Sequence, residues 1–105
     1  MNILFICSRN KRRSATAEAI FRNHPEHAVQ SAGTAEGAVH RVNEKLLLWA
    51  DVVFVMEKRH REILHKRYNK IFDTIRLVVL DIPDEYEYMN EELVKMLHDI
   101  VNPYL

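Results

Sequence analysis

The sequence predicts an α/β protein in which a parallel sheet is covered by helices on both faces. Continuous apolar runs at 2–7 (NILFIC), 51–56 (DVVFVM) and 75–82 (IRLVVLDI) are typical of strands buried on both faces. Segments with helical character separate these runs and follow the last one. Because strands and helices alternate along the chain, a parallel sheet is favoured over an antiparallel one.

The elements can be assigned in order, giving the pattern βαβαβαβα. The strands are expected at residues 2–7, 28–34, 51–56 and 75–82. The helices are expected from Ser14 to before Pro25, over 44–50, over 57–68 and after Asn90. Asn43 and Asn90 are the expected N-caps, and Pro83 stops the last strand.

Composition indicates one globular domain, residues 1–105, and sets limits on its partners. The chain is 48% apolar and 29% charged, and 15 basic residues balance 15 acidic ones. No global field therefore favours nucleic acid or a membrane surface as a partner. The single cysteine excludes an intramolecular disulfide and suits a reducing compartment. With no signal-peptide pattern and no membrane-spanning run, we expect a cytoplasmic protein.

Three stretches are expected to meet at one edge of the sheet. Ligands of parallel α/β sheets bind outside the carboxyl ends of the strands. That rule brings together Cys7 onward, Ser31–Thr34 and Asp81–Tyr88. Only Gly33 and Gly37 are present, so neither a Walker loop nor a dinucleotide fingerprint can be formed.

The only cysteine stands beside the most basic run of the chain. Cys7 ends the first strand and Ser14 begins the first helix, so the residues between them form a loop whose amides can bind an anion, together with the helix dipole. The same groups stabilise a thiolate, which is a nucleophile. Arg13 can grip two oxygens of an oxyanion, and Ser14 can donate to the sulfur. Asn10 suits a left-handed turn.

Simpler explanations exist for both features. A cysteine that ends an apolar strand is often only a small buried side chain, and loop cations are often only solvated charges. The strand–loop–helix context favours function, because it supplies the donors that the chemistry needs. The residues predicted to bind phosphate or substrate are Ser8, Arg9, Asn10, Lys11, Arg12 and Arg13.

These motifs resemble the low-molecular-weight protein tyrosine phosphatases. CSRNKRRS, at residues 7–14, is similar to the phosphate-binding loop of that family. TAE, SAGT, ADVVFVM and IPDEY agree with later family motifs in the same order, and the resemblance covers nearly the whole chain. It implies a three-layer, flavodoxin-like fold with four parallel strands, and hydrolysis through a phosphocysteine.

The resemblance assigns roles to matching residues. Cys7 is the nucleophile, Arg13 holds the phosphoryl group and Ser14 assists the thiolate. Asn10, with Ser31, supports the loop. The general acid is expected to be Asp84, since it lies between Ile-Pro and Tyr as in the family; a carboxyl can protonate the leaving group and then activate water. Asp81, at the end of the strand, is the alternative acid.

Departures from the family pattern suggest a shallower and more basic site. Arg9 stands where glycine is usual, Arg12 where a second cysteine is common, and Glu85 where proline follows the acid. The chain is also shorter between SAGT and ADVVFVM, where relatives carry a loop that walls the substrate pocket. Tyr86 and Tyr88 are candidates for the remaining pocket wall, or pack in the last loop.

The leading hypothesis is a phosphomonoesterase acting on phosphotyrosine or a small phosphomonoester, with inorganic phosphate or sulfate also binding the loop. Arsenate reduction is less favoured, because it normally uses several cysteines. A phosphocarrier similar to the sugar-transport IIB proteins, or a phosphate-binding protein without turnover, is the alternative from another class. No cofactor or metal is expected, since the histidines show no liganding pair and are interpreted as surface residues.

Overall fold

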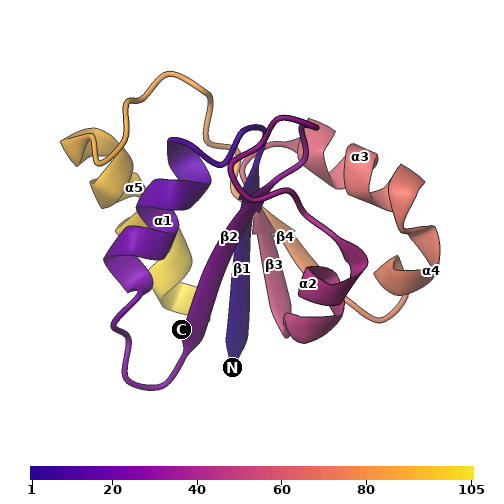
Figure 1. Ribbon diagram of the computed structural model, residues 1–105. Coiled ribbons are helices and arrows are strands. Elements are labelled where there is room, and N and C mark those ends of the chain that lie inside the picture. Colours follow the sequence, from indigo (N-terminus) through magenta and orange to yellow (C-terminus); the bar gives the residue numbers. More distant parts are fainter.

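One four-stranded sheet lies between two layers of helices in the computed structural model, which describes residues 1–105 (Figure 1). The strands are β1 (Asn2–Cys7), β2 (Ala28–Gly33), β3 (Val52–Val55) and β4 (Arg76–Val79). The helices are α1 (Arg13–Phe21), α2 (Glu44–Trp49), α3 (Lys58–Arg67), α4 (Asn69–Phe72), α5 (Glu91–Val101) and the 3₁₀ turn η1 (Asn102–Tyr104). None of them combines the length and the apolar character needed to cross a membrane.

The strands are all parallel and follow the order β2-β1-β3-β4. The chain moves from β1 to one neighbour, β2, and then crosses to the other side to form β3. The loop after β1 therefore lies at the switch point of strand order, where such sheets bind ligands. The predicted fold class is confirmed: α/β, three layers, with a four-stranded parallel sheet of the flavodoxin-like order.

Alternate residues of the strands supply two separate cores. Ile3 and Phe5 of β1 face the side covered by α1 and α5, while Leu4 and Ile6 face the side covered by α2, α3 and α4 (Figure 1). All four side chains are fully buried. Because both faces are covered, strands of this kind are continuously apolar and do not alternate with polar residues. Because β1 pairs with β2 on one side and β3 on the other, the position of its last residue, Cys7, is fixed by the sheet.

Capping follows the prediction at two helices. The Asn43 side chain accepts from the amide of Leu46 at the start of α2, and Asn90 accepts from the amides of Glu92 and Leu93 at the start of α5. Each side chain satisfies backbone donors that a helix leaves free at its first turn.

Two elements differ from the prediction: strand β4 is shorter than expected, and the short helix α4 precedes it. β4 ends at Val79, and Asp81 takes a left-handed conformation with φ 55°, so the segment 75–82 is not one strand. Arg76 is exposed and the rest of β4 is only partly buried, because this strand forms the edge of the sheet. A short additional helix, α4, follows α3 and was not predicted.

Candidate functional site: a cysteine in a basic anion-binding cavity

The loop between β1 and α1 forms one wall of a cavity of about 380 Å³ at the carboxyl edge of the sheet. Its lining residues come from this loop, from α3 and from the loop after β4: Cys7, Ser8, Arg9, Lys11, Arg12, Arg13, Arg59 and Asp84. The structure thus brings Asp84 to the same cavity as Cys7 and Arg13, as the rule for parallel sheets predicts.

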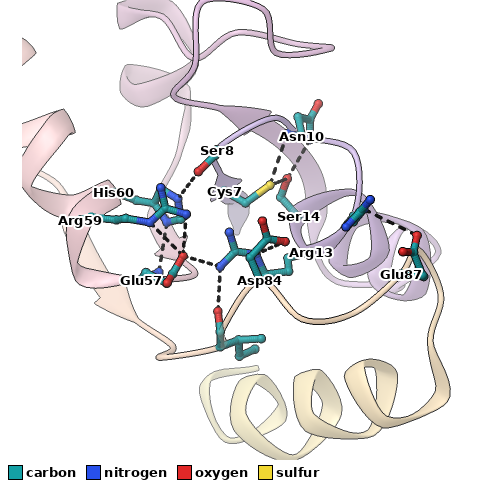
Figure 2. Close-up of polar contacts among 12 residues, drawn as sticks. Cys7, Ser8, Asn10, Arg13, Ser14, Glu57, Arg59, His60, Asp84 and Glu87 are labelled. Atoms are coloured by element: carbon teal, nitrogen blue, oxygen red, sulfur yellow. Dashed lines mark hydrogen bonds and ion pairs between the residues drawn. The ribbon is translucent and has the colours of Figure 1, made fainter.

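Cys7 is surrounded by hydrogen-bond donors. Its Sγ lies 2.9 Å from the Ser14 hydroxyl and 3.3 Å from the amide nitrogen of Asn10, which donates to it. The Asn10 side-chain amide donates to the Ser14 oxygen at 2.9 Å, so the Ser14 proton is left for the sulfur or for the Ala32 carbonyl, which is farther away at 3.4 Å (Figure 2). A hydroxyl proton directed at sulfur stabilises a thiolate and improves it as a leaving group.

Asn10 has the conformation and contacts of a loop-supporting residue. Its φ is 59°, a left-handed value that Asn tolerates better than most residues, and its side chain is buried. Its side-chain Nδ2 also donates to the Ser31 hydroxyl at 2.9 Å, and Ser31 donates to the Glu18 carboxylate at 2.6 Å. A chain of hydrogen bonds therefore runs from Glu18 on α1 through β2 to the sulfur.

The loop backbone offers donors to an anion. The amides of Ser8, Arg9, Lys11 and Arg12 donate to no acceptor within the protein. They lie in the turn that leads into the N-terminus of α1. Free amides that cluster beside a helix N-terminus bind tetrahedral oxyanions.

Arg13 is buried, with 2% of its surface exposed, yet it lines the cavity. Its Nη1 donates to the Glu57 carboxylate at 2.7 Å and to the Ile82 carbonyl at 2.8 Å, which uses both hydrogens of that nitrogen. Nε and Nη2 make no hydrogen bond within the protein. They form the planar fork that binds two oxygens of a phosphate group.

Glu57 positions two arginines, and it was not predicted. One of its oxygens accepts from Arg13 and also from Nε and Nη2 of Arg59, at 3.1 and 2.9 Å (Figure 2). Burial alone would raise the pKa of Glu57, but hydrogen bonds from Arg13 and Arg59 and their charges outweigh it and lower the pKa below its ordinary value. The carboxylate is therefore ionised. Its position directly after β3, at the same edge of the sheet, could have revealed it.

His60 is fully buried, so its interpretation as a surface residue was wrong. Its Nδ1 accepts from the Glu57 amide at 3.1 Å, within a capping box at the start of α3. Nε2 of the neutral ring then carries the proton and donates to the Ser8 hydroxyl at 2.9 Å. The Ser8 proton is left to point into the cavity. Burial, followed by the charges of Arg13 and Arg59, lowers the pKa of His60 to about 4.

The two candidate acids lie in different places. Asp84 lines the cavity, is half-exposed, and has its Oδ1 3.7 Å from Nε of Arg13. Asp81 lines a separate depression with Glu57, Lys58, Arg59 and Pro83. Only Asp84 is positioned to reach a group bound at Cys7.

The predicted aromatic wall is not formed by Tyr86 or Tyr88. Tyr86 packs against the core on the α5 side, where its hydroxyl donates to the Met96 sulfur at 3.6 Å. Tyr88 is 53% exposed, and neither residue lines the cavity. Both follow Asp84 on the segment between β4 and α5, which lines the cavity only through Asp84. Arg12, by contrast, lines the cavity and also pairs with Glu87 at 3.6 Å.

Taken together, these contacts define a class: a doubly wound α/β protein whose first loop holds a cysteine and a buried arginine around an oxyanion site. Residues 2–47 match the family described as low molecular weight phosphotyrosine protein phosphatase. This match confirms the resemblance to that family, which is a family of phosphomonoester hydrolases. No curated protein gives a significant match.

Solved structures of several phosphatases share the fold over almost the whole chain. The tyrosine phosphatase Wzb from Escherichia coli K30, in complex with phosphate, has a TM-score of 0.80 at 20% identity, covering 98% of this chain and 94% of its own. YwlE arginine phosphatase from Geobacillus stearothermophilus has a TM-score of 0.77 at 22% identity, covering 98% and 92%. Wzb from Vibrio vulnificus, in complex with benzylphosphonate, has a TM-score of 0.77 at 22% identity, covering 98% and 95%.

Proposed function

We propose that this protein is a cysteine-dependent phosphomonoesterase that works through a phosphocysteine intermediate. The observation that carries the proposal is the position of Arg13: it is buried, anchored through one nitrogen, and has its Nε and Nη2 free beside Cys7 in the cavity. A buried guanidinium with an unused bidentate edge is suited to a phosphoryl group. The chain would act as one domain, residues 1–105, in the cytoplasm, where its free thiol stays reduced.

The reaction proceeds in two steps. The Cys7 thiolate attacks phosphorus, the bond to the ester oxygen breaks, and Asp84 gives its proton to the departing oxygen. Asp84 then takes a proton from a water molecule whose oxygen attacks phosphorus; the S–P bond breaks and phosphate is released. Arg13 and the loop amides stabilise the charge on the phosphoryl oxygens in both steps. Ser14 stabilises the thiolate when it departs.

Two classes of substrate should be assayed first. Phosphotyrosine is the class that the family description and the tyrosine phosphatases among the similar structures support. Phosphoarginine is the second, since YwlE is an arginine phosphatase of the same fold. The cavity contains no aromatic residue, so the phosphate itself, and not a phenyl ring, provides most of the contacts.

Hydrolysis of p-nitrophenyl phosphate and of ethyl phosphate tests the mechanism. We expect Cys7→Ser to abolish turnover of both esters. When the reaction of the wild-type enzyme is stopped rapidly during turnover, a phosphate group should be found covalently bound to Cys7. Asp84→Asn should slow ethyl phosphate about a hundredfold or more and p-nitrophenyl phosphate much less, because an alkoxide needs the proton and a nitrophenoxide does not.

Asp81→Asn is the matched control and should retain the wild-type rates. Loss of activity in Asp81→Asn alone would make Asp81 the acid. A wild type that accumulates a stable phosphocysteine would be a phosphocarrier, and one that binds phosphate without turnover would be a binding protein; either result would contradict the proposal.

A further inference from the structure

The cavity carries more positive charge than one phosphoryl group requires. Of its eight lining residues, five are basic and only Asp84 is acidic. Cys7 is the one apolar residue among them. The whole chain has no net charge, so this concentration is local to the site.

The basic residues differ in how far their charges are neutralised. Arg13 and Arg59 share the carboxylate of Glu57, Arg13 also pairs with Asp84 at 3.7 Å, and Arg12 is 3.6 Å from the exposed Glu87. Arg9 and Lys11 have no carboxylate within ion-pair distance. Two cations at the cavity are thus unpaired, and Arg59 keeps its Nη1 hydrogens free of any protein acceptor.

The phosphoryl group bound at Cys7 does not need these additional cations. Its oxygens can be held by Nε and Nη2 of Arg13 and by the free loop amides, as described above. We propose that the substrate is a small phosphomonoester with a second anionic group, either a phosphate or a carboxylate. Arg9, Lys11 and Arg59 bind this second group at the mouth of the cavity. This inference rests on the phosphomonoesterase function proposed above.

The other features of the cavity agree with this class of substrate. A volume of about 380 Å³ suits a small molecule. A phenyl ring would find no aromatic side chain, since Tyr86 and Tyr88 lie elsewhere. A guanidinium leaving group would meet the unpaired charges of Arg9 and Lys11, which repel it. A second anion, in contrast, gains from each of them, and most when it is partly removed from water.

Two pairs of esters of nearly equal size test the proposal. Phosphoglycolate carries a carboxylate that ethyl phosphate lacks, and carboxyphenyl phosphate carries one that phenyl phosphate lacks. We expect kcat/KM for the doubly anionic member to exceed that of its partner at least about tenfold, as two or three partly exposed ion pairs would give. Salt should weaken the preference, since these charges are accessible to counterions.

Charge-removing variants identify the residues responsible. Arg9→Gln, Lys11→Gln and Arg59→Gln should each reduce the ratio of the two kcat/KM values about twofold, and the triple variant should bring it close to one. Arg61→Gln is the matched control: it removes an exposed cation from α3 that does not line the cavity, and should leave the ratio unchanged.

The outcomes separate this inference from the function on which it rests. If no ester is hydrolysed in a Cys7-dependent way, the phosphomonoesterase proposal fails. If both members of each pair are hydrolysed equally well, the phosphatase stands and the second-anion proposal is wrong. A preference only for phosphotyrosine peptides with acidic flanking residues would also overturn it, since the partner would then be a protein.

Discussion

His60 fixes the direction of a hydrogen bond at the site without touching the reacting atoms. It accepts from the Glu57 amide through Nδ1, so only Nε2 can donate to Ser8. A protonated ring would carry a hydrogen on Nδ1 as well and would clash with that amide donor. Burial and the nearby charges of Arg13 and Arg59 also oppose protonation, and they lower the pKa of His60 to about 4.

This shift predicts a stability that depends on pH. In the unfolded chain the pKa of His60 returns to about 6.5. Between that value and about 4 the unfolded chain binds a proton that the folded chain does not, so the free energy of unfolding decreases as the pH falls. Lowering the pH from about 7 to about 5 should cost about 2 kcal/mol from this residue alone, measured by urea denaturation.

His60→Gln is the comparison, because glutamine does not titrate. Between pH about 7 and about 5, the free energy of unfolding of the variant should fall by about 2 kcal/mol less than that of the wild type. Identical pH dependence in the two proteins would show that His60 titrates normally. A parallel assay of activity would report its positioning role, since the variant should raise KM more than it lowers kcat if Ser8 serves mainly to bind the phosphoryl group.

Among single residues, the sequence predicted the site residues whose contacts are local in the chain and missed others whose contacts are long-range. Cys7, Asn10 and Ser14 contact one another across the β1–α1 loop and the first turn of α1, so their spacing along the chain carries the information. The contact between Ser8 and His60 spans 52 residues, and only the folded chain shows it.

At the scale of elements, the end of β2 approaches the loop after β1 closely enough to exclude a side chain. A Cβ on Gly33 would lie 2.5 Å from the Ser8 carbonyl oxygen, 2.7 Å from the Ala38 Cβ and 3.0 Å from the Asn10 amide nitrogen. Two of these three contacts are backbone atoms of the β1–α1 loop. The position therefore requires glycine because the loop and the strand are in contact.

Gly33→Ala should consequently damage both stability and activity. We expect a loss of about 1–3 kcal/mol in the free energy of unfolding, as for other overpacked positions, together with a large fall in kcat/KM because the loop must shift. Gly37→Ala is the control, since a Cβ there would meet no atom within 4 Å. Chemical denaturation and ester hydrolysis check both variants. An active, fully stable Gly33→Ala protein would show that the loop does not depend on this contact.

The order of strands and helices was predictable because it depends on local patterns, whereas the ends of β4 were not. An apolar run predicts a strand on any part of a sheet, but β4 is an edge strand whose regular pairing ends at Val79. Its exit carries Ile82 and Asp84 toward Arg13, and this path depends on long-range contacts. The same path takes Tyr86 to α5, which is why no aromatic wall forms.

At the scale of the whole molecule, a neutral chain concentrates its cations where four carboxyl strand ends meet. Six of the fifteen acidic residues lie between Asp81 and Glu92, and Glu57 and Asp84 are the carboxylates that pair with Arg13. The folded protein should therefore bind phosphate at a site that the unfolded chain lacks, and binding to the folded state alone raises stability.

Inorganic phosphate should thus raise the thermal unfolding midpoint well beyond the effect of ionic strength. At a concentration a hundred times Kd the gain is about 2.7 kcal/mol, equivalent to about ten degrees or more for a domain of this size. Chloride at matched ionic strength should have little effect. Arg13→Lys should reduce the shift, because an ammonium keeps a charge near Glu57 but cannot supply the free fork of Nε and Nη2, whereas Arg61→Gln should not. Equal shifts with phosphate and chloride would mean that the loop amides and Arg13 do not form an anion site.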